Sequence, residues 1–110
     1  MRTRTPPLAP KLTDNVTIHI VLNDFGELGR AFLETDEREA DEWTIVSNII
    51  SGEYSNPVRV VAFNIAEGWS HDVTEDIAQA VIERGRSENH FSEAAKEFVE
   101  RTLGETVTVE

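Results

Sequence analysis

The stretch Val16-Thr17-Ile18-His19-Ile20-Val21-Leu22 decides the fold, because apolar side chains recur at every second position along it. A period of two is typical of a β-strand with one strongly apolar face. The members of that apolar row are Val16, Ile18, Ile20 and Leu22. His19 belongs to the opposite row, so it is expected on the more solvated face of the strand.

The segment after this strand admits two interpretations. Asn23 to Gly26 is typical of a turn, since Asn, Asp and Gly tolerate the backbone angles that turns require. As a strand, residues 30–34 would pair back on the first strand in a hairpin. As a helix, residues 28–35 would be short and interrupted by Gly29. Because Gly26 and Gly29 bracket a compact connection, the hairpin is favoured.

Three later segments carry apolar residues at helical spacing, which predicts amphipathic helices. Each begins at a residue whose side chain can cap the first turn, and two are followed by a glycine that can end a helix. These helices are expected to run from Asp36 to Gly52, from Asp72 to Gly85, and from Ser92 to Leu103.

A central strand is predicted between the first two helices. Residues 58–63 form an apolar run broken only by Arg59, which indicates a strand buried on both faces. The predicted fold is α+β in the order β-β-α-β-α-α, with a small mixed sheet of about three strands covered by three amphipathic helices. Residues 14–104 are expected to form one domain, with tails at 1–13 and 105–110.

The chain is strongly acidic, with 21 Asp and Glu against 10 Lys and Arg and a net charge of −11. The predicted domain contains no cluster of basic residues of the kind that binds nucleic acids or anionic membranes, so neither partner is expected. The acidic run at residues 34–42 has two interpretations: a solvated helix start, or a docking patch for a basic protein. The whole excess of charge can also serve solubility alone.

Cysteine is absent, which excludes disulfides, thiolate catalysis and sulfur-based zinc sites. Residues 5–11 lack the apolar run of a signal peptide. No stretch of the sequence has the apolar length of a membrane span. A cytoplasmic protein is therefore expected.

The loop at residues 64–72 is the candidate surface for a ligand or a partner. It leaves the predicted central strand and enters a helix, which is where ligands bind in open α/β sheets. Its amide, carboxylate, indole, hydroxyl and imidazole groups belong to Asn64, Glu67, Trp69, Ser70, His71 and Asp72. The structural alternative is that Asp72 caps the helix and Trp69 covers an edge of the core.

No catalytic, cofactor or metal site is predicted. A general base needs an orienting group and a reacting group within reach, and no nucleophile motif stands near His71. The three histidines, His19, His71 and His90, lack the spacing of a metal site. The run from Gly26 to Arg30 lacks the Lys and the Ser or Thr of a phosphate-binding loop.

Several motifs resemble a family of small hypothetical bacterial proteins. They are Asp24-Phe25-Gly26-x-x-Gly29-Arg30-Ala31, Glu34-Thr35-Asp36, Asn56-Pro57-Val58-Arg59-Val60-Val61-Ala62-Phe63-Asn64 and Glu67-Gly68-Trp69-Ser70. The resemblance extends over residues 15–83. It implies a bacterial, cytoplasmic protein, and it implies no activity, cofactor, partner or site residue.

These observations predict a noncatalytic protein–protein interaction or regulatory module. The alternative is a small-molecule binder or minor enzyme that uses the loop at residues 64–72. A homodimer that pairs through an exposed sheet edge is a third hypothesis.

Overall fold

In the computed structural model, which describes residues 15–33 and 41–104, the alternating stretch forms strand β1, Thr17–Asp24. The 3-10 turn η1, Gly26–Leu28, connects it to strand β2, Arg30–Leu33, which pairs back on β1 in antiparallel register. The hairpin interpretation of this segment is therefore confirmed. The predicted tails at 1–13 and 105–110 lie outside the described residues.

Strand β3, Pro57–Asn64, is the predicted central strand, and it pairs with β1 on one side. Strand β4, Trp69–Asp72, pairs with β3 on the other side, so the sheet has the order β2-β1-β3-β4. The prediction of about three strands is close, but it missed β4, and the sheet is antiparallel rather than mixed.

Two local features explain the missed strand and its direction. Trp69–Asp72 shows no apolar alternation, so its own sequence does not predict a strand. It is a strand because it pairs with β3. The turn before it is held by Asn64, whose side-chain oxygen accepts from Glu67 N (2.8 Å) and whose carbonyl accepts from Gly68 N (2.9 Å). Such a short connection can only join antiparallel strands.

The helices are α1, Glu42–Ser51, α2, Thr74–Glu88, and α3, Glu93–Leu103. Ser92 caps α3 by accepting from Ala95 N (3.1 Å), and Gly52 ends α1 in the left-handed conformation, as predicted. The cap of α1 is Asp41, which accepts from Thr44 N (2.8 Å). The described helix thus begins later than predicted, and the predicted cap Asp36 lies outside the described residues.

The prediction that Gly85 ends α2 is wrong. The helix continues to Glu88 and ends at Asn89, which has a φ of 52°. A Cβ on Gly85 would lie 2.2 Å from Cε1 of Phe91, so the ring packs directly on the helix backbone there. Gly85 therefore serves close packing within the last turn of the helix rather than chain reversal.

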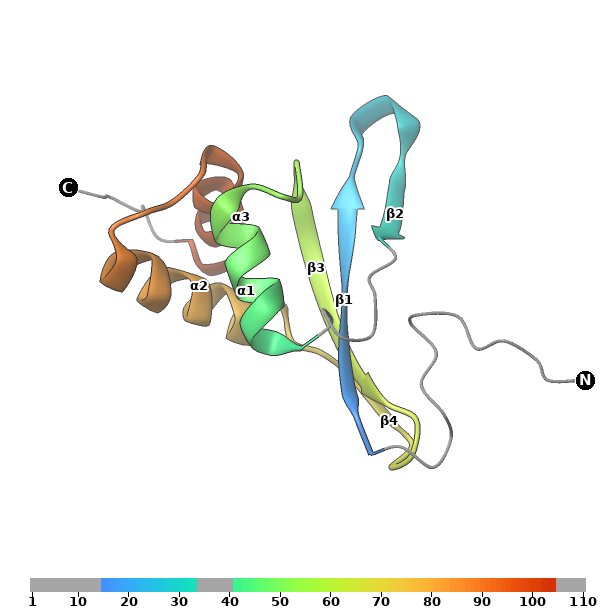
Figure 1. Cartoon of the computed structure of the whole chain (residues 1–110). Coiled ribbons are helices and arrows are strands. Elements are labelled where there is room, and N and C mark those ends of the chain that lie inside the picture. Colours follow the sequence, from blue (N-terminus) through green and yellow to red (C-terminus); the bar gives the residue numbers. More distant parts are fainter. Residues whose placement is uncertain (1–14, 34–40, 105–110) are drawn as a thin grey trace, which may run out of the picture.

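All three helices pack on one face of the sheet (Figure 1). Strand residues Val21 and Val60 join this core, which also includes Ile45, Ile49, Ile77, Val81 and Phe98 from the helices. The register places His19 opposite Ala62 on this face, and His19 is only 9% exposed. The prediction that His19 lies on the more solvated face is therefore wrong.

The more apolar row of β1 points away from the helices. Directly opposite residues of an antiparallel pair share a face, and the pairs Ile18–Phe63, Ile20–Val61 and Leu22–Phe32 lie on this side. We call this surface the open face; its apolar members are Phe32, which is exposed, Ile18, which is fully buried, and the half-buried Ile20, Leu22, Val61 and Phe63. Strand β3 was predicted to be buried on both faces. It is fully buried only on the helix side, because Val61 and Phe63 on the other side are half-buried.

In the part of the chain that the structure describes, no helix is both long enough and apolar enough to cross a membrane.

Candidate functional site

The six residues of the predicted surface lie in the hairpin of β3 and β4, not in one loop. Asn64 is the last residue of β3 and is 2% exposed, and residues 69–72 form β4. Only residues 65–68 make the turn. The interpretation of residues 64–72 as a loop is therefore wrong for both of its ends.

Most of these side chains bond to one another or to their neighbours. The Glu67 carboxylate accepts from Trp69 Nε1 (2.7 Å) and from Asn15 Nδ2 (3.0 Å). These two hydrogen bonds, that from Trp69 first, lower the pKa of Glu67. Asn64 Nδ2 donates to Asn15 Oδ1 (2.7 Å), and the Trp69 ring stacks on His71 with centroids 5.2 Å apart. These contacts hold the hairpin together.

Asp72 lies apart from these contacts, at the junction of β4 with α2. Its carboxylate accepts from Thr74 N (2.9 Å), from Thr74 Oγ1, and from Arg59 Nη1 (3.0 Å). The hydrogen bond from the Thr74 hydroxyl is the main reason that the pKa of Asp72 is lowered, and the Arg59 charge lowers it further. The prediction that Asp72 is the helix cap is wrong by one position: Val73 is the N-cap and makes no side-chain cap bond, whereas Asp72 precedes it and accepts from Thr74 N, the first N–H of the helix.

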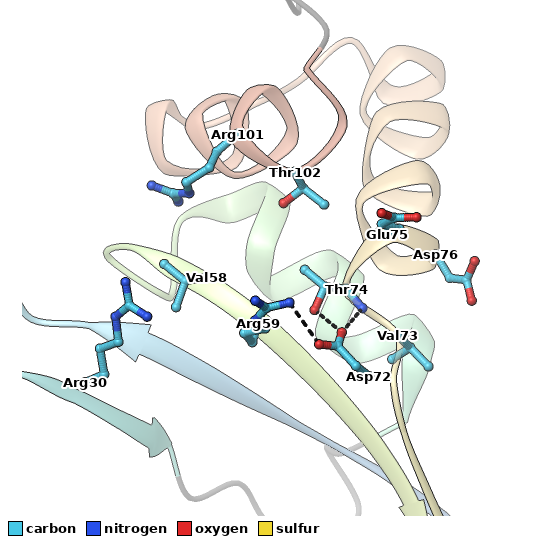
Figure 2. A pocket seen from close by; sticks show the side chains of 10 residues that line it. All are labelled: Arg30, Val58, Arg59, Asp72, Val73, Thr74, Glu75, Asp76, Arg101 and Thr102. Carbon is cyan, nitrogen blue, oxygen red and sulfur yellow. Dashed lines mark hydrogen bonds and ion pairs between the residues drawn. The ribbon is translucent and has the colours of Figure 1, made fainter.

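A surface cavity of about 600 Å³ opens beside this junction (Figure 2). It exists because β4 pairs only with residues 61–64 of β3, so the first half of β3 has no neighbouring strand on that side. The chain leaving β4 closes one end of this gap, since Val73 N donates to Val60 O (2.9 Å) and Val60 N donates to Thr74 Oγ1 (3.0 Å). The start of α2, the end of α3 and Arg30 of β2 form the remaining walls.

Three arginines from three elements line this cavity: Arg30 of β2, Arg59 of β3 and Arg101 of α3. They are half of the cationic side chains in the described residues, the others being Arg84, Arg86 and Lys96. In a chain with a net charge of −11, this concentration of positive groups sets the cavity apart. Sequence analysis missed it, because only the tertiary structure brings the three positions together.

The three guanidinium groups differ in their partners. Arg59 pairs with Asp72 (3.0 Å), and Arg30 pairs with Asp24 (3.3 Å). Arg101 Nη2 donates to the neutral oxygens Asn56 Oδ1 (3.0 Å) and Pro57 O (3.1 Å). Among residues 15–33 and 41–104, no carboxylate lies within ion-pair distance of Arg101. Its orientation is therefore held while its charge has no matching carboxylate at close range.

The charges of the cavity are separated into two ends. The hydrogen bond from Gly26 N is the main cause that lowers the pKa of Asp24, and the charges of Arg30 and Arg101 add to it. Arg30 and Arg101 lie at one end of the cavity, which we call the cationic end; there Arg30 is paired with Asp24 (Figure 2). At the opposite end lie Glu75 and Asp76, in the first turn of α2, with the Arg59–Asp72 ion pair between the two ends (Figure 2).

No protein-family model matches this chain, and neither a curated protein nor a solved structure matches it. In the described ranges no group of three His, Cys, Asp or Glu side chains is arranged to hold a metal ion. The two features of the described structure that suggest a function are the arginine-lined cavity and the open face of the sheet.

Proposed function

We propose that this protein is a noncatalytic protein-interaction module that binds its partner through the open face of the sheet. The observation that carries this proposal is the orientation of β1, whose more apolar row faces away from the helices. The row continues across β3 and β2, where Phe32 is 50% exposed. Around the exposed Phe32, the half-buried Ile20, Leu22, Val61 and Phe63 keep part of their apolar surface accessible, and its burial by a partner is worth about 25 cal/mol per Å².

The partner that fits this surface best is a second copy of the chain. Two antiparallel sheets pack face to face about 10 Å apart, and an apolar patch is complementary to itself across a twofold axis. The charged side chains along this side of the sheet are paired, Asp24 with Arg30 and Arg59 with Asp72. Two copies can therefore approach here without bringing unpaired like charges together. A basic partner would find no excess of acid on this face.

The test is the mass of the protein in solution, measured by sedimentation equilibrium from micromolar to submillimolar concentration. We expect a dimer for the native chain and a monomer for Phe32→Lys, because the new ammonium group would be buried in the apolar interface. Leu28→Lys is the matched control: Leu28 is 91% exposed and lies in η1, outside the open face. This control variant should remain a dimer.

Circular dichroism establishes whether each variant keeps its fold. A native chain that stays monomeric at the highest concentration would overturn the proposal, as would a Phe32→Lys variant that dimerises as well as Leu28→Lys. If the native chain is a monomer, the open face would instead bind a different protein or another segment of the same chain.

A further inference from the structure

We propose that the cavity between β3, α2 and α3 binds a small zwitterionic molecule. Its carboxylate would lie at Arg101, and its protonated amine at Glu75 and Asp76. This site borders the protein-binding surface proposed above, since Arg30, Arg59 and Asp72 lie on the open-face side of the sheet. It extends beyond that surface, because α2 and α3, on the other side of the sheet, supply Arg101, Glu75 and Asp76.

The cationic end suits a carboxylate. A guanidinium group offers five N–H donors in a planar fork that matches two carboxylate oxygens. Within the described residues, Arg101 donates only through Nη2, and only to the neutral oxygens of Asn56 and Pro57. Those two bonds fix the plane of the group and leave its remaining donors for a ligand. Arg30 lines the same end, but its charge is paired with Asp24 (3.3 Å), so Arg101 supplies the positive charge that a ligand carboxylate meets there.

The acidic end excludes a purely anionic ligand and suits an amine. An anion that filled the cavity would meet Glu75 and Asp76, whereas a ligand carrying only positive charge would meet the arginines. Between the ends, Arg59 and Asp72 already neutralise each other, and Thr74 holds the Asp72 carboxylate in place. A molecule with opposite charges at its two ends is the one that meets an opposite charge at both ends of the cavity.

The size and construction of the cavity agree with a small ligand. Its volume of about 600 Å³ lies within the usual range of small-molecule sites, about 300–1,000 Å³. Its walls come from four separate segments that hydrogen bonds tie together, including those between Thr74 and Val60 and between Arg101 and Pro57. Such a preformed site binds without a large cost in ordering its own side chains.

The experiment is calorimetric titration of the full chain with three series of linear probes: ω-amino acids, dicarboxylates and diamines of matched length. We expect one length of ω-amino acid to bind more tightly than the dicarboxylate and the diamine of that length. Arg101→Gln should weaken ω-amino acid and dicarboxylate binding by roughly tenfold or more, the usual effect of losing a charge-assisted hydrogen bond. The double variant Glu75→Gln/Asp76→Asn should weaken ω-amino acid and diamine binding.

Two controls make the result specific. Arg86→Gln removes the same charge from an exposed position of α2 outside the cavity, and it should bind the ω-amino acid as the native chain does. Phe32→Lys should also retain binding, which separates this site from the proposed dimer interface. The zwitterion site would be overturned if no probe binds, if the dicarboxylate binds as tightly as the ω-amino acid, or if Arg86→Gln weakens binding as much as Arg101→Gln.

Discussion

At the scale of single residues, Gly85 shows that a glycine predicted to end a helix can instead lie within it, where it allows close packing. Glycine after a helical pattern usually marks the end of the helix. Here the helix continues, and the missing side chain lets the Phe91 ring rest on the backbone. A second signal does end α2: Asn89 adopts the left-handed conformation and its N–H bonds back to Arg86 O (3.2 Å).

Gly85→Ala is therefore expected to destabilise the protein, although alanine is the better helix former by about 1 kcal/mol. The added methyl group would overlap the Phe91 ring, and such overpacking costs about 1–3 kcal/mol. Urea denaturation measures the change in the free energy of unfolding. In a Phe91→Leu background the cost of Gly85→Ala should be smaller, since the ring is gone. An equal cost in both backgrounds would contradict this explanation.

At the scale of elements, Asp72 joins two strands and a helix. Its carboxylate accepts from Arg59 on β3 and from Thr74 at the start of α2, while its backbone belongs to β4. The same residue therefore ties the start of the helix to the sheet. Its lowered pKa means that folding favours the ionised form.

This favoured ionisation predicts an acid-sensitive contribution to stability. Because the pKa of Asp72 is lower in the folded state than its ordinary unfolded value, about 3.9, the contribution is complete above that value. It is lost as the pH falls through the lower, folded pKa. Measured by urea denaturation from neutral to acid pH, the free energy of unfolding should fall less steeply in Asp72→Asn than in the native chain.

Arg59→Gln separates the two causes of this shift. It leaves the Thr74 hydrogen bonds in place, and these lower the pKa of Asp72 most, so this variant should keep most of the native acid dependence. If Asp72→Asn has the same acid dependence as the native chain, the junction is not the source of the effect.

At the scale of the whole molecule, the net charge and the open face act in opposite directions. A net charge of −11 makes two copies repel each other at a distance, whereas the apolar open face attracts them at contact. Salt screens the first effect, since the Debye length falls from about 10 Å at 0.1 M to about 3 Å at 1 M. It has little effect on apolar burial.

The dimer proposed above should therefore become tighter as sodium chloride is raised. Sedimentation equilibrium at several salt concentrations measures this trend in the native chain and in Leu28→Lys, while Phe32→Lys should stay monomeric throughout. A dimer that weakens as salt rises would show that ion pairs hold it together, and the apolar open face would then not be the interface.

Much of the local structure could be predicted from the sequence. The alternation in β1, the glycines around η1, the cap at Ser92 and the left-handed end at Gly52 all depend on neighbours a few positions away. The part of the candidate site that was foreseen is Asp72, because a carboxylate before a helix is also a local signal.

The tertiary structure alone decided which face of the sheet is covered and where the cavity lies. The apolar row of β1 was evident in the sequence, but the helices carry enough apolar side chains of their own to cover the less apolar row. The cavity brings together Arg30, Arg59 and Arg101. This arrangement needs the antiparallel sheet, which places β2 and β3 in one layer, and it needs β4 to leave the first half of β3 without a neighbouring strand. The periodicity of a segment shows which of its side chains can be buried together. Which face of the sheet the helices then cover depends on the packing energy of the whole chain.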